Sequence, residues 1–325
     1  MNNTYHHKPV MLQEVIECLR IKPNGRYIDA TFGRGGHSQE ILNQLGPDGQ
    51  LIVFDKDHEA ISHAKKHFSE EPRIKVHHAC FSEIEQIMAD YAGQIDGIMV
   101  DLGVSSAQLD DPERGFSFRF NADLDMRMDH RQEETAASWL NKASKKEMAQ
   151  VLRRYGEEID AGRIAAKIIE RRDLAPIKTT KDFTDVIQDA KVRFRKKINP
   201  ATQSFQAVRI HVNQEMEVLE RFLEQAPSLL RPSGVMAILS FHSLEDRMVK
   251  RCFSRLVKPA LPRKMPILEA SIDKPYDWQV KRAMSSIEEC LVNPRARSAV
   301  LRAIRKTESM ALTTESVKSI EHQEI

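Results

Sequence analysis

The sequence predicts an α/β fold in which a parallel sheet, covered by helices on both faces, is interrupted by an inserted helical segment. Three observations favour this fold. Strand and helix signals alternate between residues 27 and 100, a glycine-rich loop follows the first strand, and strand signals disappear between residues 112 and 206. Alternation of this kind is typical of a Rossmann-like sheet that binds its ligand at the carboxyl ends of the strands.

Four short apolar strands and the amphipathic helices between them account for the first hundred residues. The strands are expected at residues 27–30, 51–54, 74–81 and 95–100. Asp57 is placed to cap the helix after the second strand. Ser82 and Glu85 have the spacing of a capping box after the third strand. These signals predict βα units in sequence, and therefore parallel strands.

The middle of the chain loses this alternation. Residues 110–129 have no clear period and are expected to form a long loop, and the signals from residue 135 to residue 190 are helical only. A strand signal returns at residues 235–241. We therefore expect a discontinuous α/β domain formed by residues 1–111 and 207–306. Residues 112–206 are expected to form an inserted helical domain, and residues 307–325 a disordered tail.

Composition excludes several classes of protein. Of the 325 residues, 41% are hydrophobic and 30% charged, which is ordinary for a chain with a full core. No apolar run reaches the roughly 20 residues of a membrane span, and Glu14 and Glu17 argue against a signal peptide. The four cysteines form no CxxC pair, which argues against a disulfide framework or zinc site. We expect a cytoplasmic protein without a membrane partner.

The glycine loop is the first candidate binding site. Gly33, Gly35 and Gly36 follow the first strand and lead into a helix whose first N–H groups are free to bind an anion. Asp55 ends the second strand, where a carboxylate can accept both hydroxyls of a ribose. Ser38 replaces the last glycine of a dinucleotide fingerprint, so the loop is more typical of S-adenosylmethionine than of NAD.

Asp101 ends the fourth strand and is expected to point toward the same crevice. It is followed by Leu-Gly-Val-Ser-Ser, which gives Asp101, Ser105 and Ser106 the position of catalytic groups. A carboxylate that only caps a turn is the alternative for Asp101.

Beyond these residues the chain resembles a known family, that of ribosomal RNA small subunit methyltransferase H. The resemblance runs from about residue 7 to residue 305 and rests on motifs that occur in order, namely Thr31-Phe-Gly-Arg-Gly-Gly-His-Ser38, Asp101-Leu-Gly-Val-Ser-Ser106, Gln108-Leu-Asp-Asp111, Arg114-Gly-Phe-Ser-Phe118, Leu124-Asp-Met-Arg-Met128, Phe205-Gln-Ala-Val-Arg-Ile210, Ser240-Phe-His-Ser-Leu-Glu-Asp-Arg247 and Asn293-Pro-Arg-Ala-Arg-Ser298. At positions 203 and 204 the chain has Gln-Ser, where the family resemblance leads one to expect Thr-Arg or a similar polar pair. This difference concerns the expected contacts with RNA and not those with the cofactor.

The resemblance implies an enzyme that transfers a methyl group from S-adenosylmethionine to N4 of a cytosine in the decoding region of 16S rRNA. It implies a class I methyltransferase fold with an inserted helical domain, and 16S rRNA within the small ribosomal subunit as partner. The implied cofactor contacts are Gly35, Gly36, His37, Asp55, Phe81, Asp101 and Gln108. No metal is required, and the chain is expected to be a monomer or a homodimer.

Methyl transfer to a cytosine amino group requires alignment of the acceptor nitrogen and a hydrogen-bond acceptor for its N–H. Asp101 is followed here by neither proline nor an aromatic residue, so the acceptor stays open among Asp101, Ser105 and Ser106. A flipped base could be gripped by Phe116, Phe118 and Phe120, although these rings could equally anchor their loop to the core.

Basic residues concentrate in two stretches without acids, residues 191–209 and 293–306, although the net charge of the chain is only +2. Such stretches favour a phosphate-binding surface, and two solvated faces are the alternative. The candidate RNA contacts are Arg195, Lys196, Lys197, Arg209, His242, Arg295 and Arg297.

A metal site and two other functions are the alternatives. His63 and His67 share a helix face but do not match the spacing of a zinc helix. Ser38, at the position of the last glycine of a dinucleotide fingerprint, argues against an NAD-dependent oxidoreductase. Asp55 and Asp101 beside the glycine loop argue against a non-enzymatic RNA-binding protein, which would not need them.

Overall fold

A computed structural model gives the structure of the chain and describes residues 9–191, 199–258 and 274–308. Its centre is a seven-stranded sheet with the strand order β3-β2-β1-β4-β5-β7-β6. Strands β1 to β5 are parallel, and β7 is antiparallel to both β5 and β6. The bounds of the strands are β1 Arg26–Asp29, β2 Gln50–Asp55, β3 Ile74–His78, β4 Ile95–Asp101, β5 Leu230–Ser240, β6 Tyr276–Met284 and β7 Val300–Lys306.

This order confirms the Rossmann-like α/β fold that the sequence predicts. The chain starts in the middle of the sheet at β1, builds outward to β3 and then returns to β4 on the other side of β1. The carboxyl ends of β1 and β4 therefore face a crevice where the strand order reverses. The prediction was wrong in one respect, because β3 ends at His78 rather than at residue 81.

Helices cover both faces of the sheet and enclose two hydrophobic cores. Alternate residues of a strand point to opposite faces, so Ile28 of β1 lies in one core and Tyr27 lies in the other. One face is covered by α1 Leu12–Leu19, α2 Gly36–Gln44 and α3 His58–His67. The other is covered by α4 Ile84–Ile87, α11 Glu215–Leu229 and α12 Ser243–Val257.

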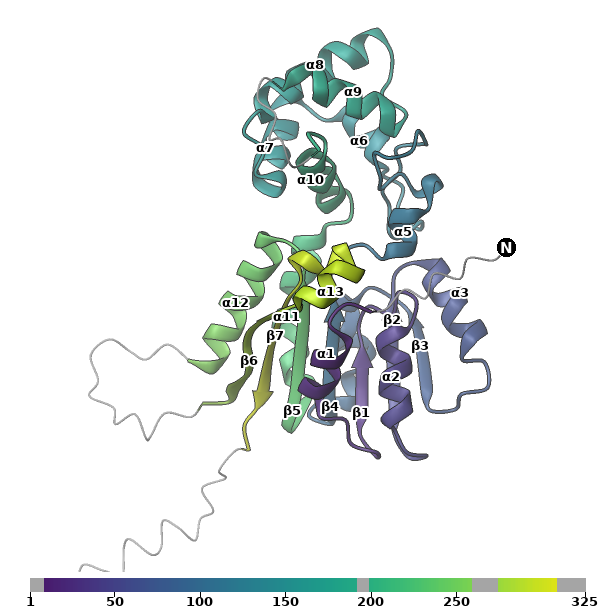
Figure 1. The fold of residues 1–325 in the computed structure, drawn as a ribbon, viewed down its shortest axis with the longest axis vertical. Helices are drawn as coiled ribbons and strands as arrows, with labels where there is room; N and C mark the ends of the chain where they lie inside the picture. Colours follow the sequence, from purple (N-terminus) through teal and green to yellow (C-terminus); the bar gives the residue numbers. More distant parts are fainter. Residues whose placement is uncertain (1–8, 192–198, 259–273, 309–325) are drawn as a thin grey trace, which may run out of the picture.

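The chain between β4 and β5 is helical, as the sequence predicts. Figure 1 shows α6 to α10 gathered beyond the carboxyl ends of the parallel strands, with α5 at the start of the connection. The bounds of these helices are α5 Ser106–Asp110, α6 Ala136–Lys142, α7 Lys145–Gly156, α8 Ala161–Leu174, α9 Thr180–Ala190 and α10 Thr202–Val212. Their apolar faces join the core that contains α11 and α12, so the helices continue the packing of the sheet.

Short elements complete the fold, namely the 3₁₀ helices η1 Phe81–Glu83, η2 Ala89–Tyr91, η3 Pro112–Arg114 and η5 Pro294–Ser298, and the helix α13 Ile287–Val292. Asp57 caps α3 as predicted, with its side chain accepting from the Glu59 N–H. The capping box predicted at Ser82 and Glu85 was wrong. The Glu83 carboxylate accepts from the Cys80 N–H, and this pair begins η1 two residues earlier.

No helix among the described residues is long and apolar enough to cross a membrane. The tail predicted to be disordered lies mostly outside the described residues, which end at residue 308.

Candidate functional site

The glycine loop forms a tight turn between β1 and α2. Gly33 and Gly35 have φ values of 56° and 78°, in the left-handed region that favours glycine. At Gly36 a Cβ atom would lie 2.2 Å from Cγ of Pro9, so the N-terminal segment packs directly on the loop. Gly35 is the N-cap of α2. The first N–H groups of the helix, from Gly36 onward, have no carbonyl partner within the helix and can therefore bind a ligand.

Asp29 fixes the shape of this loop. One carboxylate oxygen accepts the Ser38 hydroxyl at 2.6 Å, and the other accepts the Thr31 N–H at 3.1 Å. Burial raises the pKa of Asp29 to about 7 in spite of these two hydrogen bonds. The serine that replaces the last glycine of a dinucleotide fingerprint thus binds an acid at the end of β1.

Asp55 lies at the end of β2, against the same loop. Its Oδ2 accepts the Gly33 N–H at 2.8 Å, and its Oδ1 accepts the Asp57 N–H at 2.9 Å. Burial raises the pKa of this carboxyl group above its ordinary value. The two hydrogen bonds hold the carboxylate at the crevice, and its remaining lone pairs can accept hydrogen bonds from a ligand.

Asp101 ends β4 and adds a third buried carboxyl group. Its backbone N–H donates to Oγ1 of Thr31 at 2.7 Å, which joins the end of β4 to the glycine loop. Its Oδ1 is buried without a hydrogen-bond partner among the described residues. Burial, together with the charges of Asp29 and Glu245, raises the pKa of Asp101 to about 8. A buried polar atom without a partner is rare and often marks a functional group.

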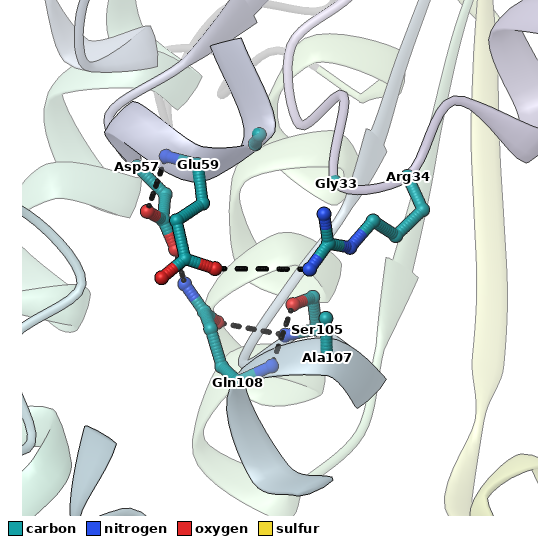
Figure 2. A pocket seen from close by; sticks show the side chains of 8 residues that line it. Gly33, Arg34, Asp57, Glu59, Ser105, Ala107 and Gln108 are labelled. Carbon is teal, nitrogen blue, oxygen red and sulfur yellow. Dashed lines mark hydrogen bonds and ion pairs between the residues drawn. The ribbon is translucent and has the colours of Figure 1, made fainter. Parts of the chain in front are cut away.

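A polar network closes one side of the crevice (Figure 2). Asp57 accepts from Nε2 of Gln108 at 2.6 Å and from Nη1 of Arg114 at 2.9 Å. Gln108 also forms a capping box with Ser105, whose hydroxyl accepts the Gln108 N–H at 3.2 Å. Gly33, Ser105 and Gln108 line a small pocket, which brings the glycine loop and the start of α5 together.

A second network lies on the opposite side of Asp101. Glu245, near the start of α12, accepts the Phe241 N–H at 2.8 Å, and it lies 3.0 Å from Nε2 of His242. Burial would raise the pKa of Glu245, but the hydrogen bond and charge of His242 and the charge of Arg209 hold it below its ordinary value. Arg209 is paired with Glu215 at 2.8 Å.

The ligand atoms of Glu215, His242 and Glu245 lie within 4.8 Å of one another, so these three groups could together hold a metal ion. However, Arg209 already neutralises Glu215, and Glu245 has backbone and histidine partners. We therefore interpret this cluster as an ion-pair network.

Other predicted cofactor contacts lie around the same crevice. Phe81 begins η1 just after β3, where its ring packs edge-on against Phe222 with centroids 5.2 Å apart. The ring of His37 is turned away and lies 3.1 Å from the carbonyl oxygen of Val10, and burial lowers the pKa of this histidine to about 4. Only the backbone of His37 is therefore available to a ligand.

The predicted RNA contacts that the structure describes belong to three separate elements, α10, the start of α12 and η5. Arg195, Lys196 and Lys197 lie outside the described residues. The side chain of Arg209 is half-buried and forms an ion pair with Glu215. Arg295 forms a bidentate ion pair with Asp110. His242 is the N-cap of α12, and Arg297 is exposed.

The phenylalanine loop is anchored mainly to the core. Phe116 is buried, and Phe118 packs on Phe205 with centroids 5.5 Å apart. Phe120 alone of the three is exposed, at 41%. Phe116 and Phe118 therefore anchor their loop to the core.

Glu215 and Glu245 were not predicted as residues of the site, and Arg114, which the sequence offers as a residue that could grip the base, was not predicted to pair with Asp57. Arg114 pairs with Asp57, which is 57 residues away, and Glu215 pairs with Arg209 of α10, so only tertiary structure reveals these two pairs. His242 and Glu245 have the three-residue spacing of a capping box, and this spacing could have marked Glu245 as a capping residue.

Comparisons with known proteins identify the family. The MraW methylase family matches residues 4–307. Proteins named ribosomal RNA small subunit methyltransferase H are 47% identical in Stenotrophomonas maltophilia strain R551-3, with 94% of each chain covered, and 46% identical in Thioalkalivibrio sulfidiphilus, with 92% of this chain and 97% of the relative covered. A third, from Shewanella denitrificans, is 45% identical over 94% of this chain and 99% of its own.

The chain carries the buried carboxyl groups and the glycine loop of a cofactor crevice, and its cofactor is S-adenosylmethionine. The chain belongs to the MraW methylase family.

Proposed function

We propose that this protein transfers the methyl group of S-adenosylmethionine to N4 of a cytosine in the decoding region of 16S rRNA. The relatives named as methyltransferases of small-subunit ribosomal RNA support the class of substrate. The observation that carries the chemistry is the unpartnered, buried Oδ1 of Asp101 at the crevice.

The residues at the crevice fit S-adenosylmethionine. The cofactor supplies an electrophilic methyl group on a sulfonium, and it also carries an ammonium and a carboxylate. When they are ionised, the carboxyl groups of Asp29 and Asp101 place negative charge beside the crevice, which suits the two cationic groups even though the oxygens of Asp29 are hydrogen-bonded to the loop. The first N–H groups of α2, at Gly36 and His37, suit the carboxylate.

Asp55 is proposed to accept hydrogen bonds from the ribose, because its carboxylate is held at the loop by two backbone N–H groups. Phe81 is proposed to pack on the adenine, with Gln108 nearby on the opposite wall. Gly33 and Gly35 allow the backbone to approach the ligand closely.

Asp101 is the proposed acceptor for the amino group of cytosine. The lone pair of N4 is delocalised into the ring, and an acceptor for one N–H makes this nitrogen a better nucleophile as the methyl group arrives. The hydroxyl of Ser105 already accepts a backbone N–H in its cap, which makes Ser105 a weaker candidate. Ser106 remains a candidate by its position at the start of α5.

The lack of a cysteine in the loops after β1 and β4 also favours the amino nitrogen over the ring carbon C5. Methylation of C5 requires a thiolate that adds to the ring. Burial raises the pKa of Cys18 to about 12 and that of Cys252 to about 11, so both stay protonated. The loops after β1 and β4 contain no cysteine.

The helical segment between β4 and β5 is proposed to act as a lobe that holds the RNA over the crevice. This assigns residues 112–206 to an inserted domain and residues 1–111 and 207–306 to the methyltransferase domain. Arg195, Lys196, Lys197, Arg297 and His242 are proposed RNA contacts at or near its edges.

Methylation of purified small ribosomal subunits that lack the modification tests the proposal. The subunits are incubated with the enzyme and labelled S-adenosylmethionine, and the RNA is digested to nucleosides to identify the modification and, in parallel, to oligonucleotides to locate it, both by mass spectrometry. We expect N4-methylcytidine at a single position of the decoding region. A label on C5 of cytosine, or on another base, would refute the assignment to N4.

A further inference from the structure

Helix α12 has an exposed face on which every charged side chain is basic. Its exposed positions include Arg247, Lys250, Arg251 and Arg255, which recur at the spacing of one helix face. The acids of this helix are not on that face, because Glu245 is buried and Asp246 is paired with Arg302 at 2.6 Å.

These cations have few acidic partners. Among the described residues Lys250, Arg251 and Arg255 form no ion pair, and Arg247 forms only a long one with Glu157 at 3.6 Å. The positive charge on this face is therefore almost uncompensated at short range.

Helix α7 carries a second basic face. Lys146, Gln150, Arg153 and Arg154 line a shallow hollow of about 460 Å³ on the surface. The three basic residues form no ion pair within the described parts of the chain, and Arg154 lies over the ring of Tyr155 at 5.1 Å.

The two faces meet at the crevice. Glu157 caps the end of α7 and accepts the hydroxyl of Ser243 at 3.3 Å, at the first residue of α12. Figure 1 shows α7 and α12 following one another along the same side of the molecule. His242, the N-cap of α12, lies at this junction beside the carboxyl groups of the site.

Other surface helices lack this bias. On α8 and α9, Lys167 is paired with Glu170 at 2.5 Å and Lys181 with Asp185 at 2.5 Å. Exposed cations paired with neighbouring acids are typical of a solvated face. A solvated face does not explain α12, whose exposed charges have one sign.

We infer that the exposed faces of α7 and α12 form one track that binds the phosphate backbone of the RNA substrate and leads it to the crevice. The helices are about 18 Å and about 22 Å long at 1.5 Å per residue, so together they can contact several successive phosphates. This inference rests on the proposed function for the identity of the RNA, and it gives that function a binding surface other than residues 191–209.

The charge pattern favours RNA over an anionic membrane. A membrane-binding helix combines its cations with large apolar side chains on the same exposed surface. The exposed positions of α12 carry no large apolar side chain. The hollow beside Arg153 and Arg154 suits a projecting phosphate better than a flat lipid surface.

The test compares two variants that each lose three positive charges. The track variant replaces Lys250, Arg251 and Arg255 with Ala, and the control variant replaces Lys22, Lys65 and Lys66, three exposed lysines outside the helical lobe, with Ala. Alanine is well tolerated in helices and at exposed positions, so both proteins should fold. Binding to transcribed 16S rRNA is measured over a range of salt concentrations, and cofactor affinity is measured by calorimetry.

Each phosphate contact contributes about 0.7–0.9 to the slope of log affinity against log salt, so the track variant should lose about 2 from that slope. The control variant should keep the wild-type slope, and both should bind S-adenosylmethionine normally. Equal slopes for the track variant and the wild-type protein would overturn the inference. So would a loss of binding to phosphatidylglycerol vesicles without any change in RNA binding.

The two proposals fail in different ways. If the wild-type protein binds 16S rRNA through α12 but leaves the cytosine unmodified, the track stands and the proposed reaction is wrong. If the wild-type protein forms N4-methylcytidine and the track variant does so at the rate of the control, the reaction stands and the track is wrong.

Discussion

Asp101 is the residue on which the proposed reaction depends most directly. It combines a position at the end of β4, a carboxylate oxygen without a partner and a strongly raised pKa. Asp29 has a similar burial, but both of its oxygens already accept hydrogen bonds from the loop. The difference assigns a structural role to Asp29 and leaves Asp101 able to contact substrate.

Asp101→Asn should slow methyl transfer by about 10²–10⁴-fold, the usual contribution of a positioned proton acceptor. The amide keeps the shape of the side chain but accepts a hydrogen bond more weakly than a carboxylate. The measurement is a single-turnover rate at saturating cofactor, which separates the chemical step from cofactor binding.

Asp110→Asn is the matched control, because Asp110 is an exposed carboxylate nearby that pairs with Arg295. It should react at nearly the wild-type rate. A rate for Asp101→Asn that equals this control would exclude Asp101 as the acceptor.

At the level of single residues, the sequence predicts which side chains lie at the crevice more readily than it predicts their hydrogen-bond partners. Asp55 and Asp101 could be placed because each ends an apolar strand before a loop. The sequence identifies Asp57 as a cap, but not as the acceptor for Gln108 and Arg114, which lie 51 and 57 residues away. Such contacts depend on how the loop after β4 folds back, which no local pattern encodes.

The loop from residue 112 to residue 128, whose apolar side chains pack on the core, also contains one buried ion pair. Arg114 is only 4% exposed in its side chain and donates to Asp57 as well as to the carbonyl oxygen of Arg127. Because Asp57 also caps α3, this pair links the loop, the start of a helix and Gln108 at the crevice.

Arg114→Met should therefore lower the free energy of unfolding by about 3–5 kcal/mol, because it leaves the charge of Asp57 buried without its cation. Arg131→Met is the control, since Arg131 forms an exposed pair with Asp129 in the same part of the chain and should cost about 0–1 kcal/mol. Denaturant unfolding monitored by circular dichroism measures both.

Asp57→Asn should recover part of that loss when it is combined with Arg114→Met, because the double variant has no unpaired buried charge. Additive losses in the double variant would show that the two side chains do not interact.

At the level of elements, the sequence predicts the βα units well and the last part of the sheet poorly. The first four strands are apolar and lie between helices with clear caps. Strands β6 and β7 were missed because they carry charged residues such as Lys281 and Arg302. Arg302 is buried in β7 only because Asp246 of α12 neutralises it, and this compensation is visible only in three dimensions.

Considered as a whole, the molecule concentrates buried carboxyl groups at one end of the sheet. Asp29, Asp55 and Asp101 lie at the carboxyl ends of β1, β2 and β4, and burial raises the pKa of each. Without a bound cation this arrangement costs stability whenever these groups are ionised. The crevice is therefore poised to bind a cationic cofactor at the expense of the stability of the empty protein.

The stability of the empty protein should fall as the pH rises from 6.5 to 8. The carboxyl groups of Asp29 and Asp101 keep their protons up to a pH of about 7 and about 8 in the folded state, whereas the unfolded chain loses them near pH 3.8. The folded state thus binds more protons over this window, and the free energy of unfolding decreases as they are lost. His37 acts in the opposite direction at the lower end of this window, because burial lowers its pKa from 6.5 to about 4 and the unfolded chain still loses this proton near pH 6.5.

Denaturant unfolding at pH 6.5, 7.25 and 8 measures this dependence, and Asp101→Asn provides the control because an amide does not titrate. That variant should show a shallower decrease than the wild-type protein. S-adenosylmethionine should bind more tightly at pH 8 than at pH 6.5, because its cationic groups favour the ionised carboxylates. Binding should therefore release protons, which calorimetry in buffers of different ionisation enthalpy measures. If the stability did not depend on pH and no protons were released, these carboxyl groups would already be ionised before the cofactor binds. Other groups of the protein would then stabilise the buried carboxylates in place of the cofactor.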